Sequence, residues 1–486
     1  MERGESEKDI HAPCRERIGA LEAVTATQRT LLEELQRKVQ ELEARVNQNS
    51  RNSSKPPSSD PPSVPPKPPQ APTGRKAGGQ PGHEGHAREL LPPDQVSQIV
   101  ILKPDRCRKC RKKLKGEDPD PLRHQVTELP PLCAETTEWQ QQRLGCECGE
   151  STLAPLPPGV PEGVLGPRLK ALLAYLTGQA HLSKRQIEEV MKDAFGVKIS
   201  LGTVVAAQQA VSEAVAPAVE EAKAYVEEQD VVNADETGWK EGNRETGQGG
   251  RKKAWLWVAV TQWVTLFMIH ANRGTDAARA LLGRFSGTLG TDRWNAYNDW
   301  SVRKRQICFS HLIRDFVGFV DRGRGAAQIG KALLLETRKM FVLWHRVRDG
   351  TLARSSFRIY MGPIRRRFER FLRKGTQCGE SKTEGMCGMI LKLAPALWTF
   401  VRIEGVEPTN NVAERAVRPA VLYRKGCFGT QSEEGSRFVE RILTVVATLR
   451  QQKRNVMDYL TETCIRADFG MKPRSLLPRA AHKTAA

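Results

Sequence analysis

The chain has 486 residues and a formal net charge of +20 at pH 7, with 76 Lys and Arg against 56 Asp and Glu. This excess of positive charge favours a polyanionic partner, nucleic acid above all. The length predicts roughly two to four domains. The N-terminus lacks the apolar core of a secretory signal, and the longest near-apolar stretch is strand-like and interrupted by polar residues, so we expect neither secretion nor a membrane span.

Eleven cysteines occur in this chain. Without a secretory signal they are interpreted as free thiols and metal ligands rather than disulfides. We therefore expect a reduced, cytoplasmic protein associated with the nucleoid.

A seven-residue repeat of apolar side chains predicts a coiled coil over residues 15–49. Its a and d positions are Ile18, Leu21, Leu32, Leu35, Val39, Leu42 and Val46, with Thr25 and Gln28 as a polar interruption. The pattern favours a helix that pairs with a second copy of the chain. The alternative is a single amphipathic helix packed on the rest of the molecule.

Residues 50–95 are dense in Ser, Pro and Gly and form a predicted linker. A segment of this composition cannot bury a core, so we expect it to be extended. Its Arg and Lys side chains are suited to lie along a phosphate backbone, which adds affinity without sequence information.

Two close cysteine pairs predict a zinc-ribbon-like domain over residues 96–155. The pairs are Cys107 with Cys110, and Cys146 with Cys148. Strands are expected between the pairs, at residues 125–128 and 136–144, and four thiolates suit a structural Zn²⁺. Cys133 and His124 are alternative ligands, and free surface thiols are the alternative to a metal site.

Three helical segments predict a helix-turn-helix-like domain over residues 163–222. They cover residues 167–182, 183–195 and 200–215, with Ser183 and Ser200 as the expected N-caps of the second and third. Because the last helix has few basic side chains, a purely structural helical unit is the alternative.

Two of the next predicted strands end on carboxylates. The first ends on Asp235 and Glu236, and the second ends on Asp292. Between them we expect a hairpin of strands at residues 254–260 and 264–270 and a helix at residues 275–284. Two strands of one sheet that end in this way can place both carboxylates at the same edge, where oxygen ligands hold hard divalent cations. A turn or cap role is the alternative for each Asp.

The long interval after Asp292 has mainly helical patterns, which predict a helical insertion over residues 312–405. A strand is expected before it, at residues 303–309, with His311 just past the strand end. Basic side chains of the insertion are suited to track DNA, with a solvated helix face as the alternative. They are Arg365, Arg366, Arg367, Arg370, Arg373 and Lys374.

Glu414 supplies a third acid at the start of a predicted helix. Asp, Asp and Glu at this spacing indicate a triad for two-metal phosphoryl transfer, in which two ions about 3.5–4 Å apart clamp the attacking and leaving oxygens. Mg²⁺, or Mn²⁺, suits such an all-oxygen site. The alternative is a capping box, with Asn411 as N-cap and Glu414 as its carboxylate.

The basic residues after this acid are expected to contact DNA. They are Arg415, Arg418, Arg424 and Lys425, of which Arg418 shares the helical face of Glu414. A last helix over residues 435–452 is predicted to pack a stripe of Phe438, Ile442, Val445 and Leu449 on the sheet. Residues 461–486 are expected to form a basic tail, disordered from Lys472.

Several segments resemble the transposases of the insertion-sequence-66 family. They are NADETGW, WLWVAV, RGTDAARALLG, TDRWNAY, CFSHLIRDF and NNVAERAVRPAVLYRKGCFGTQSEEG, and the family also has a linker with GGQPGH. The resemblance implies that Asp235, Asp292 and Glu414 are the DDE triad of a ribonuclease-H-like catalytic domain over residues 228–460. It also implies that His311 lies near the active site, as a phosphate contact or a residue behind the metal ligands.

The chain is thus expected to be a multidomain α/β protein and a DNA transposase. The resemblance implies cleavage at the terminal inverted repeats of a mobile element and transfer of the exposed 3′-hydroxyl into target DNA. The N-terminal modules would recognise the repeats, a homo-oligomer would pair two ends, and accessory proteins of the element are further expected partners. The alternatives are a non-catalytic DNA-binding regulator or decayed transposase, and a nuclease without strand transfer.

Overall fold

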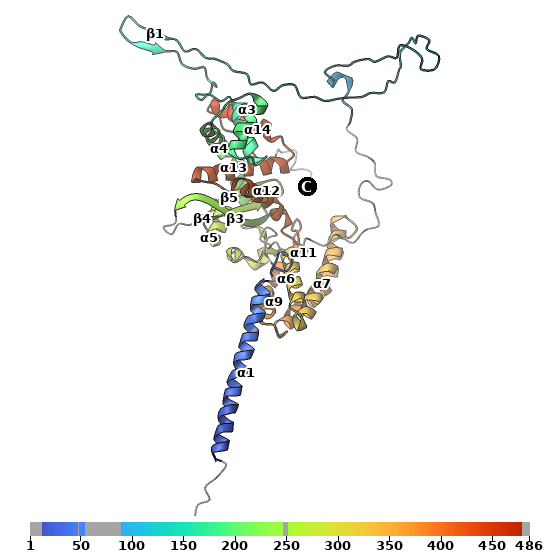
Figure 1. Cartoon of the computed structure of the whole chain (residues 1–486), viewed down its shortest axis with the longest axis vertical. Coiled ribbons are helices and arrows are strands. Elements are labelled where there is room, and N and C mark those ends of the chain that lie inside the picture. Colours follow the sequence, from blue (N-terminus) through green and yellow to red (C-terminus); the bar gives the residue numbers. More distant parts are fainter. Residues whose placement is uncertain (1–11, 47, 54–88, 246–250, 479–486) are drawn as a thin grey trace, which may run out of the picture.

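The computed structural model describes residues 12–46, 48–53, 89–245 and 251–478 (Figure 1). Its centre is a five-stranded sheet with the order β5-β4-β3-β6-β7. The strands are β3 (Val231–Glu245), β4 (Arg251–Val260), β5 (Thr265–His270), β6 (Thr288–Thr291) and β7 (Arg305–Ile307). β3, β4 and β5 are antiparallel neighbours, which confirms the predicted hairpin, whereas β3, β6 and β7 are parallel to one another.

The helices have these bounds in chain order: α1 (Ala12–Val46), α2 (Pro167–Gly178), α3 (Lys184–Phe195), α4 (Leu201–Glu227), α5 (Thr275–Leu282), α6 (Phe309–Asp321), α7 (Arg324–Arg348), α8 (Arg354–Gly375), α9 (Ser381–Lys392), α10 (Ala394–Leu397), α11 (Thr399–Arg402), α12 (Asn411–Cys427), α13 (Glu433–Gln451) and α14 (Val456–Asp468). Short 3-10 turns are η2 (Pro93–Gln95), η3 (Asn295–Tyr297) and η4 (Val302–Lys304). None of the helices in the described ranges has both the length and the apolar character needed to cross a bilayer.

β3 continues well past its two acids, which corrects the prediction that it ends there. Only its first residues pair with β6, while its pairing with β4 runs on beyond Asp235. The outer part is held by the loop before α13, where the Gly242 amide donates to the Thr430 carbonyl at 2.7 Å and Trp239 Nε1 donates to Thr430 Oγ1 at 3.0 Å. β3 therefore pairs with β6 only through its first residues and with β4 over most of its length. Local sequence patterns do not predict these two pairings.

Helices cover the sheet, and Figure 1 shows α12 and α13 on one side of it and α5 on the other. α12 contacts β3 and β4, and α5 contacts β4 and β5. α5 ends two residues before the predicted end, because Gly283 adopts a positive φ of 54°. β7 is likewise shorter than the predicted strand.

α13 closes the free edge of β5, where unpaired amides would otherwise face outward. Three β5 amides donate to α13 side chains that are four residues apart: Thr265 to Thr448 (3.1 Å), Phe267 to Thr444 (3.0 Å) and Ile269 to Glu440. Two residues of a strand rise about 6.7 Å and four residues of a helix about 6 Å, so one alignment serves all three bonds. The predicted α13 stripe is confirmed as buried: Phe438, Ile442, Val445 and Leu449.

α13 is not the last helix, which corrects the predicted tail. α14 packs on α2 and α4. The segment after it is also held in place, because Tyr459 donates to the Arg474 carbonyl at 2.7 Å and Leu476 is fully buried. The expected disorder from Lys472 is therefore wrong up to residue 478, and residues 479–486 lie outside the described part of the chain.

The third of the three predicted N-terminal helices is much longer than expected. The N-caps Ser183 and Ser200 are confirmed, the former as a full capping box with Gln186. α4 begins against α2 and α3 but then runs into the main core, where Val215, Ala222 and other residues pack with the sheet domain. The second half of α4 is therefore structural, as in the alternative to a helix-turn-helix, because it packs in the core of the sheet domain.

α1 projects from the body as a single helix (Figure 1). Each a and d residue of the predicted repeat is at least 52 % exposed. The alternative of a helix packed on its own chain is therefore wrong, and the coiled coil stays a prediction. Of the linker, residues 54–88 lie outside the described part, whereas residues 48–53 are half-buried and Asn52 lies against Gly318 of α6.

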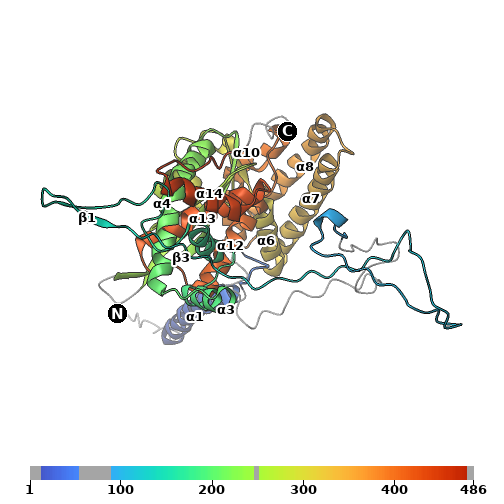
Figure 2. The same ribbon diagram turned by 90° about the horizontal axis from the view of Figure 1, so that it is seen from above.

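The predicted helical insertion is confirmed as α6 to α11, with a second core of its own. Aromatic rings fill this core, among them Phe309, Phe316, Phe368, Trp398 and Phe400. Figure 2 shows α7 and α8 lying side by side. α6 starts directly after β7, and its residues Phe309, Leu312 and Phe316 pack in this second core beside the sheet.

Candidate active site

The two aspartates occupy equivalent positions on neighbouring parallel strands. Asn233 of β3 pairs with Gly290 of β6. Two residues further on, β3 reaches Asp235 and the β6 chain reaches Asp292, so the register aligns them. Parallel strands lie about 4.8 Å apart, and residues in register face the same side of the sheet.

The side that Asp235 faces is the one covered by α12. Trp239, four residues further along β3, stacks on Tyr423 of α12 with ring centroids 5.9 Å apart. Because strand residues alternate between faces, Asp235 lies on this same side. Glu236 lies on the opposite side, where its carboxylate accepts the Tyr297 hydroxyl at 2.7 Å.

Asp292 is fixed by the turn that follows β6. Its Oδ1 accepts the Trp294 amide at 2.8 Å, and its carbonyl accepts Thr291 Oγ1 at 2.8 Å and the buried Arg305 guanidinium at 3.4 Å. Asp292 thus has the turn contact that the alternative interpretation expected. Its second oxygen remains available at the strand end.

Glu414 comes to the sheet through the residue before α12. The N-cap is Asn410, not Asn411, and its side chain makes no capping bond within the helix. Instead, Asn410 Nδ2 donates to the Ala234 carbonyl at 2.7 Å, directly beside Asp235. The capping-box alternative is therefore wrong: Glu414 stands at the fourth helical position, and α12 starts against β3.

The loop before α12 is also joined to the start of α6. The Asn410 amide donates to Cys308 Sγ at 3.1 Å, the Phe309 amide donates to the Pro408 carbonyl at 3.0 Å, and Ser310 Oγ is 2.9 Å from Asn411 Oδ1. These contacts close the insertion, so residues far apart in the chain meet at one edge of the sheet.

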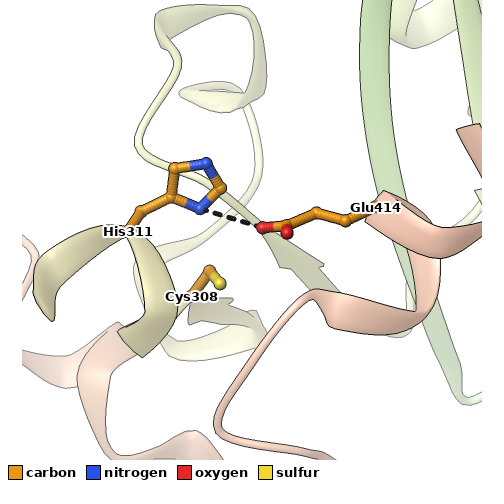
Figure 3. A group of neighbouring side chains, drawn as sticks. All are labelled: Cys308, His311 and Glu414. Atoms are coloured by element: carbon orange, nitrogen blue, oxygen red, sulfur yellow. Dashed lines mark ion pairs between the residues drawn. The ribbon is translucent and has the colours of Figure 1, made fainter. Parts of the chain in front are cut away.

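His311 lies in the first turn of α6, and Figure 3 shows it pointing at Glu414. Its Nδ1 is 3.4 Å from Glu414 Oε1, and Arg314 Nη2 is 3.8 Å from Oε2. The structure therefore places His311 beside the third acid, with Cys308 as a further neighbour. Arg418, which shares the helical face of Glu414, is exposed, and the ion pairs of Glu414 are with His311 and Arg314 instead.

The acids influence one another electrostatically. Burial raises the pKa of Asp235 well above its usual range, and the charges of Glu236, Asp292 and Glu414 raise it further. Without a cation nearby, Asp235 is therefore driven toward its protonated form. An arrangement of this kind is stabilised by positive charge between the carboxylates.

Glu236 belongs to a supporting network that sequence reasoning missed. Arg273 Nε donates to its Oε1 at 2.9 Å, and the Arg273 guanidinium lies 3.9 Å from the Trp294 ring centroid and 4.6 Å from that of Trp255. Burial and the charge of Asp292 raise the pKa of Glu236, while Tyr297 and Arg273 oppose this shift. The acidic pair thus divides into one residue on each face of the sheet.

The basic residues after Glu414 are not equivalent. Arg415, Arg418 and Lys425 are exposed on α12. Arg424 is half-buried and donates to the Gly238 carbonyl and, at 3.3 Å, to Thr237 Oγ1, so it stabilises β3. The predicted basic cluster lies along α8, where Arg366, Arg367, Arg370 and Arg373 line a shallow cavity.

The cysteine pairs form two separate turns. Cys107 and Cys110 lie in one, and Cys146 and Cys148 connect β1 (Arg143–Gly145) to β2 (Ser151–Leu153). The strands expected at residues 125–128 and 136–144 are not formed, apart from the end of the second. Hydrogen bonding within each pair lowers the pKa of Cys107 and of Cys146. In the described part of the chain the four cysteines do not meet in one site, so the zinc ribbon stays a prediction.

Comparison with known proteins identifies two matching family models, one for the N-terminal residues and one for the region that contains the central sheet. The model of a family described as "Transposase IS66 family" matches residues 162–438, and that of a family of unknown function matches residues 11–89. An uncharacterized protein, y4qI, of Sinorhizobium fredii is 25 % identical over 247 residues, which are 46 % of this chain and 46 % of that protein. The chain thus spans about half the length of this curated relative.

The matched region contains α2 to α12, the whole central sheet and the three acids, and it covers more than half of the 486 residues. The chain therefore belongs to the IS66 transposase family.

Proposed function

We propose that the protein is an active DDE transposase whose catalytic residues are Asp235, Asp292 and Glu414. The observation that carries this proposal is the register of β3 and β6, which aligns Asp235 with Asp292. The start of α12, the helix of Glu414, is bonded to the same part of β3, because the Asn410 side chain donates to the Ala234 carbonyl. The antiparallel–parallel strand order is consistent with the ribonuclease-H-like fold that the resemblance implies.

The ligand chemistry of the three acids suits two Mg²⁺ or Mn²⁺ ions, whereas their carboxylate oxygens do not all lie within 4.8 Å of one another in the described structure. All the donors are carboxylate oxygens, which hard cations prefer, and Glu414 Oε1 is buried without a hydrogen-bond partner in the described structure. Asp235, Asp292 and Glu414 would hold these ions. When bound, the ions would supply activation of the attacking oxygen and stabilisation of the leaving oxygen.

The residues around the acids orient them. Asn410 holds the first turn of α12 against β3, Arg305 and the Trp294 amide hold Asp292, and Arg273 with Tyr297 holds Glu236 behind the site. Fixed carboxylates of this kind need little reorganisation during in-line attack by water or by a 3′-hydroxyl.

The DNA would lie along exposed basic residues. Arg415, Arg418 and Lys425 on α12 and Arg366 and Arg370 on α8 are suited to contact phosphates, whereas Arg367 of α8 is paired with the buried Glu336. Terminal repeats of the element and target DNA are the proposed substrates, with the segments before α2 as repeat-binding modules. In this proposal a homo-oligomer formed through α1 pairs two ends, a structural Zn²⁺ joins the cysteine turns, and accessory proteins of the element remain candidate partners.

A nicking assay tests the proposal. Supercoiled DNA that carries the element ends is incubated with the protein and Mg²⁺, and DNA binding is measured in parallel by fluorescence anisotropy. We expect the wild type to nick and then join the ends to target DNA. Asp235→Asn should lose nicking but keep binding, whereas Asp321→Asn, an exposed change at the end of α6, should keep both.

Other outcomes favour the competing functions. Binding without nicking in the wild type would indicate a regulator or a decayed transposase. Nicking without joined product would indicate a nuclease. Nicking that survives Asp235→Asn would contradict the proposed catalytic role of this residue.

A further inference from the structure

Three side chains at the junction of α6 and α12 form a group with mixed ligand chemistry (Figure 3). Cys308 Sγ, a ring nitrogen of His311 and a Glu414 carboxylate oxygen lie within 4.8 Å of one another, and His311 Nδ1 is 3.4 Å from Glu414 Oε1. In the described ranges no other set of three or more His, Cys, Asp and Glu ligand atoms comes this close together. The group contains sulfur and nitrogen, which distinguishes it from the carboxylate triad beside it.

Two of the three donor atoms lack hydrogen bonds. His311 Nδ1 and Glu414 Oε1 are buried, and neither makes a hydrogen bond to any described residue. Arg314 lies against the other oxygen of Glu414, Oε2, and the neighbour of Oε1 is His311 Nδ1 at 3.4 Å, without hydrogen-bond geometry. A buried polar atom without a hydrogen bond destabilises the folded state. A cation bound by both atoms would remove this destabilisation.

The backbone holds the group in place. Cys308 is the N-cap of α6 and His311 is its third residue, so the two side chains lie on one face of the first turn. The Asn410 amide donates to Cys308 Sγ at 3.1 Å, and the same residue anchors the helix of Glu414. The ligand atoms therefore come from two helix starts that are hydrogen-bonded to each other.

We propose that Cys308, His311 and Glu414 form a second cation site, selective for borderline-soft divalent ions of the Zn²⁺ class and sharing Glu414 with the carboxylate triad. Thiolate and imidazole favour Zn²⁺ over Mg²⁺. Three protein ligands leave a fourth position for water. The Cys308 thiol releases its proton to solvent when the ion binds.

Occupancy of this site has a consequence for catalysis, which rests on the proposed function. An ion between Cys308 and His311 would compete for Glu414 Oε1 with an ion held by the carboxylate triad. Zn²⁺ should therefore inhibit Mg²⁺-dependent cleavage by withdrawing the third acid.

Cobalt binding tests the site independently of activity. The full chain is used in a background in which Cys107, Cys110, Cys146 and Cys148 are Ser, so that these thiols cannot contribute. Titration with Co²⁺ should then produce a thiolate-to-cobalt charge-transfer band that saturates at one equivalent. Cys308→Ser should abolish the band, and His311→Ala and Glu414→Gln should weaken Co²⁺ binding.

The serine variant is chosen because it preserves the fold. Serine is a preferred N-cap, and its hydroxyl can accept the Asn410 amide as the thiol does. Cys464→Ser, which changes a buried cysteine of α14, is the matched control and should keep the band. Absence of the band in the four-Ser background, or its persistence in Cys308→Ser, would overturn the proposal.

Zinc inhibition is the second readout. In the same background, Zn²⁺ should inhibit nicking in excess Mg²⁺, and Cys308→Ser should make the remaining nicking less sensitive to Zn²⁺. Equal sensitivity of both proteins would overturn the inhibitory role. If the protein with all its native cysteines does not nick, the proposed function fails, while the cobalt titration still decides whether the site exists.

Discussion

At the scale of single residues, the candidate site depends on side chains that bond to the backbone of another element. Asn410 is the clearest case, since its side-chain amide donates to the carbonyl of Ala234, the residue before Asp235, and so joins α12 to β3. Sequence alone predicts the three acids, because their strand and helix contexts are local patterns. It does not predict Asn410, Arg273 or Cys308 as their supports, because these contacts join segments more than 30 residues apart, and often more than 100.

Asn410→Ala should impair nicking more than DNA binding. The variant removes the bond to the Ala234 carbonyl, so Glu414 loses its fixed distance from Asp235, and a displacement of about 1 Å lowers rates on the order of 10²-fold. Asn455→Ala, which removes the N-cap of α14, is the control: it should lower stability by about 1 kcal/mol and leave the nicking rate unchanged. Equal nicking by both variants would show that Asn410 does not position the site.

Arg273→Met should destabilise the protein by about 2–3 kcal/mol. The Glu236 side chain is 1 % exposed and that of Arg273 is 32 % exposed, so the substitution leaves a buried carboxylate with Tyr297 as its remaining partner. Arg279→Met removes an exposed ion pair with Asp299 and should change stability by about 0–1 kcal/mol. Chemical unfolding followed by tryptophan fluorescence compares the two, and similar losses would contradict the buried-pair account.

At the scale of elements, the helical insertion and the α13 stripe follow from periodicity, whereas the ends of β3 and α12 do not. β3 is long because the loop at Thr430 and the strand β4 both pair with it, and α12 starts where Asn410 meets β3. Composition predicts a tail over residues 461–486, yet α14 extends to Asp468 and Leu476 is buried in the main core. Tertiary contacts decide these boundaries.

Glu440, the α13 residue that accepts the Ile269 amide of β5, should make the free energy of unfolding depend on pH. Burial raises the pKa of Glu440 from its usual 4.5 to about 7, so the folded state holds a proton that the unfolded state releases. This contribution is fully present below pH 4.5 and is lost as the pH rises through 7. Between pH 5 and 8 the wild type should therefore lose about 3 kcal/mol relative to Glu440→Gln.

The matched control is Glu434→Gln, an exposed residue in the first turn of α13. Its stability should follow that of the wild type across the same pH range. If the free energies of unfolding of the wild type and Glu440→Gln differ by the same amount at all pH values in this range, Glu440 is charged in the folded protein.

At the scale of the whole molecule, α1 should control oligomeric state. Its a and d side chains are exposed in the single chain, and a helix with such a stripe is stable when it pairs. We expect light scattering to give a multiple of the 54.2 kDa chain mass for the wild type. Leu35→Arg with Leu42→Arg should give the monomer, and Glu33→Arg, on an outer position, should not. A monomeric wild type would exclude pairing through α1.

Anomalous scattering from crystals soaked in Mn²⁺ shows whether the three distant acids form one cation site. We expect Mn²⁺ peaks in contact with the carboxylates of Asp235 and Asp292 and with that of Glu414, and loss of the peaks in Asp235→Asn. Crystals in which Mn²⁺ binds none of the three residues, or in which Glu414 stays away from the ions held by the aspartates, would contradict this expectation.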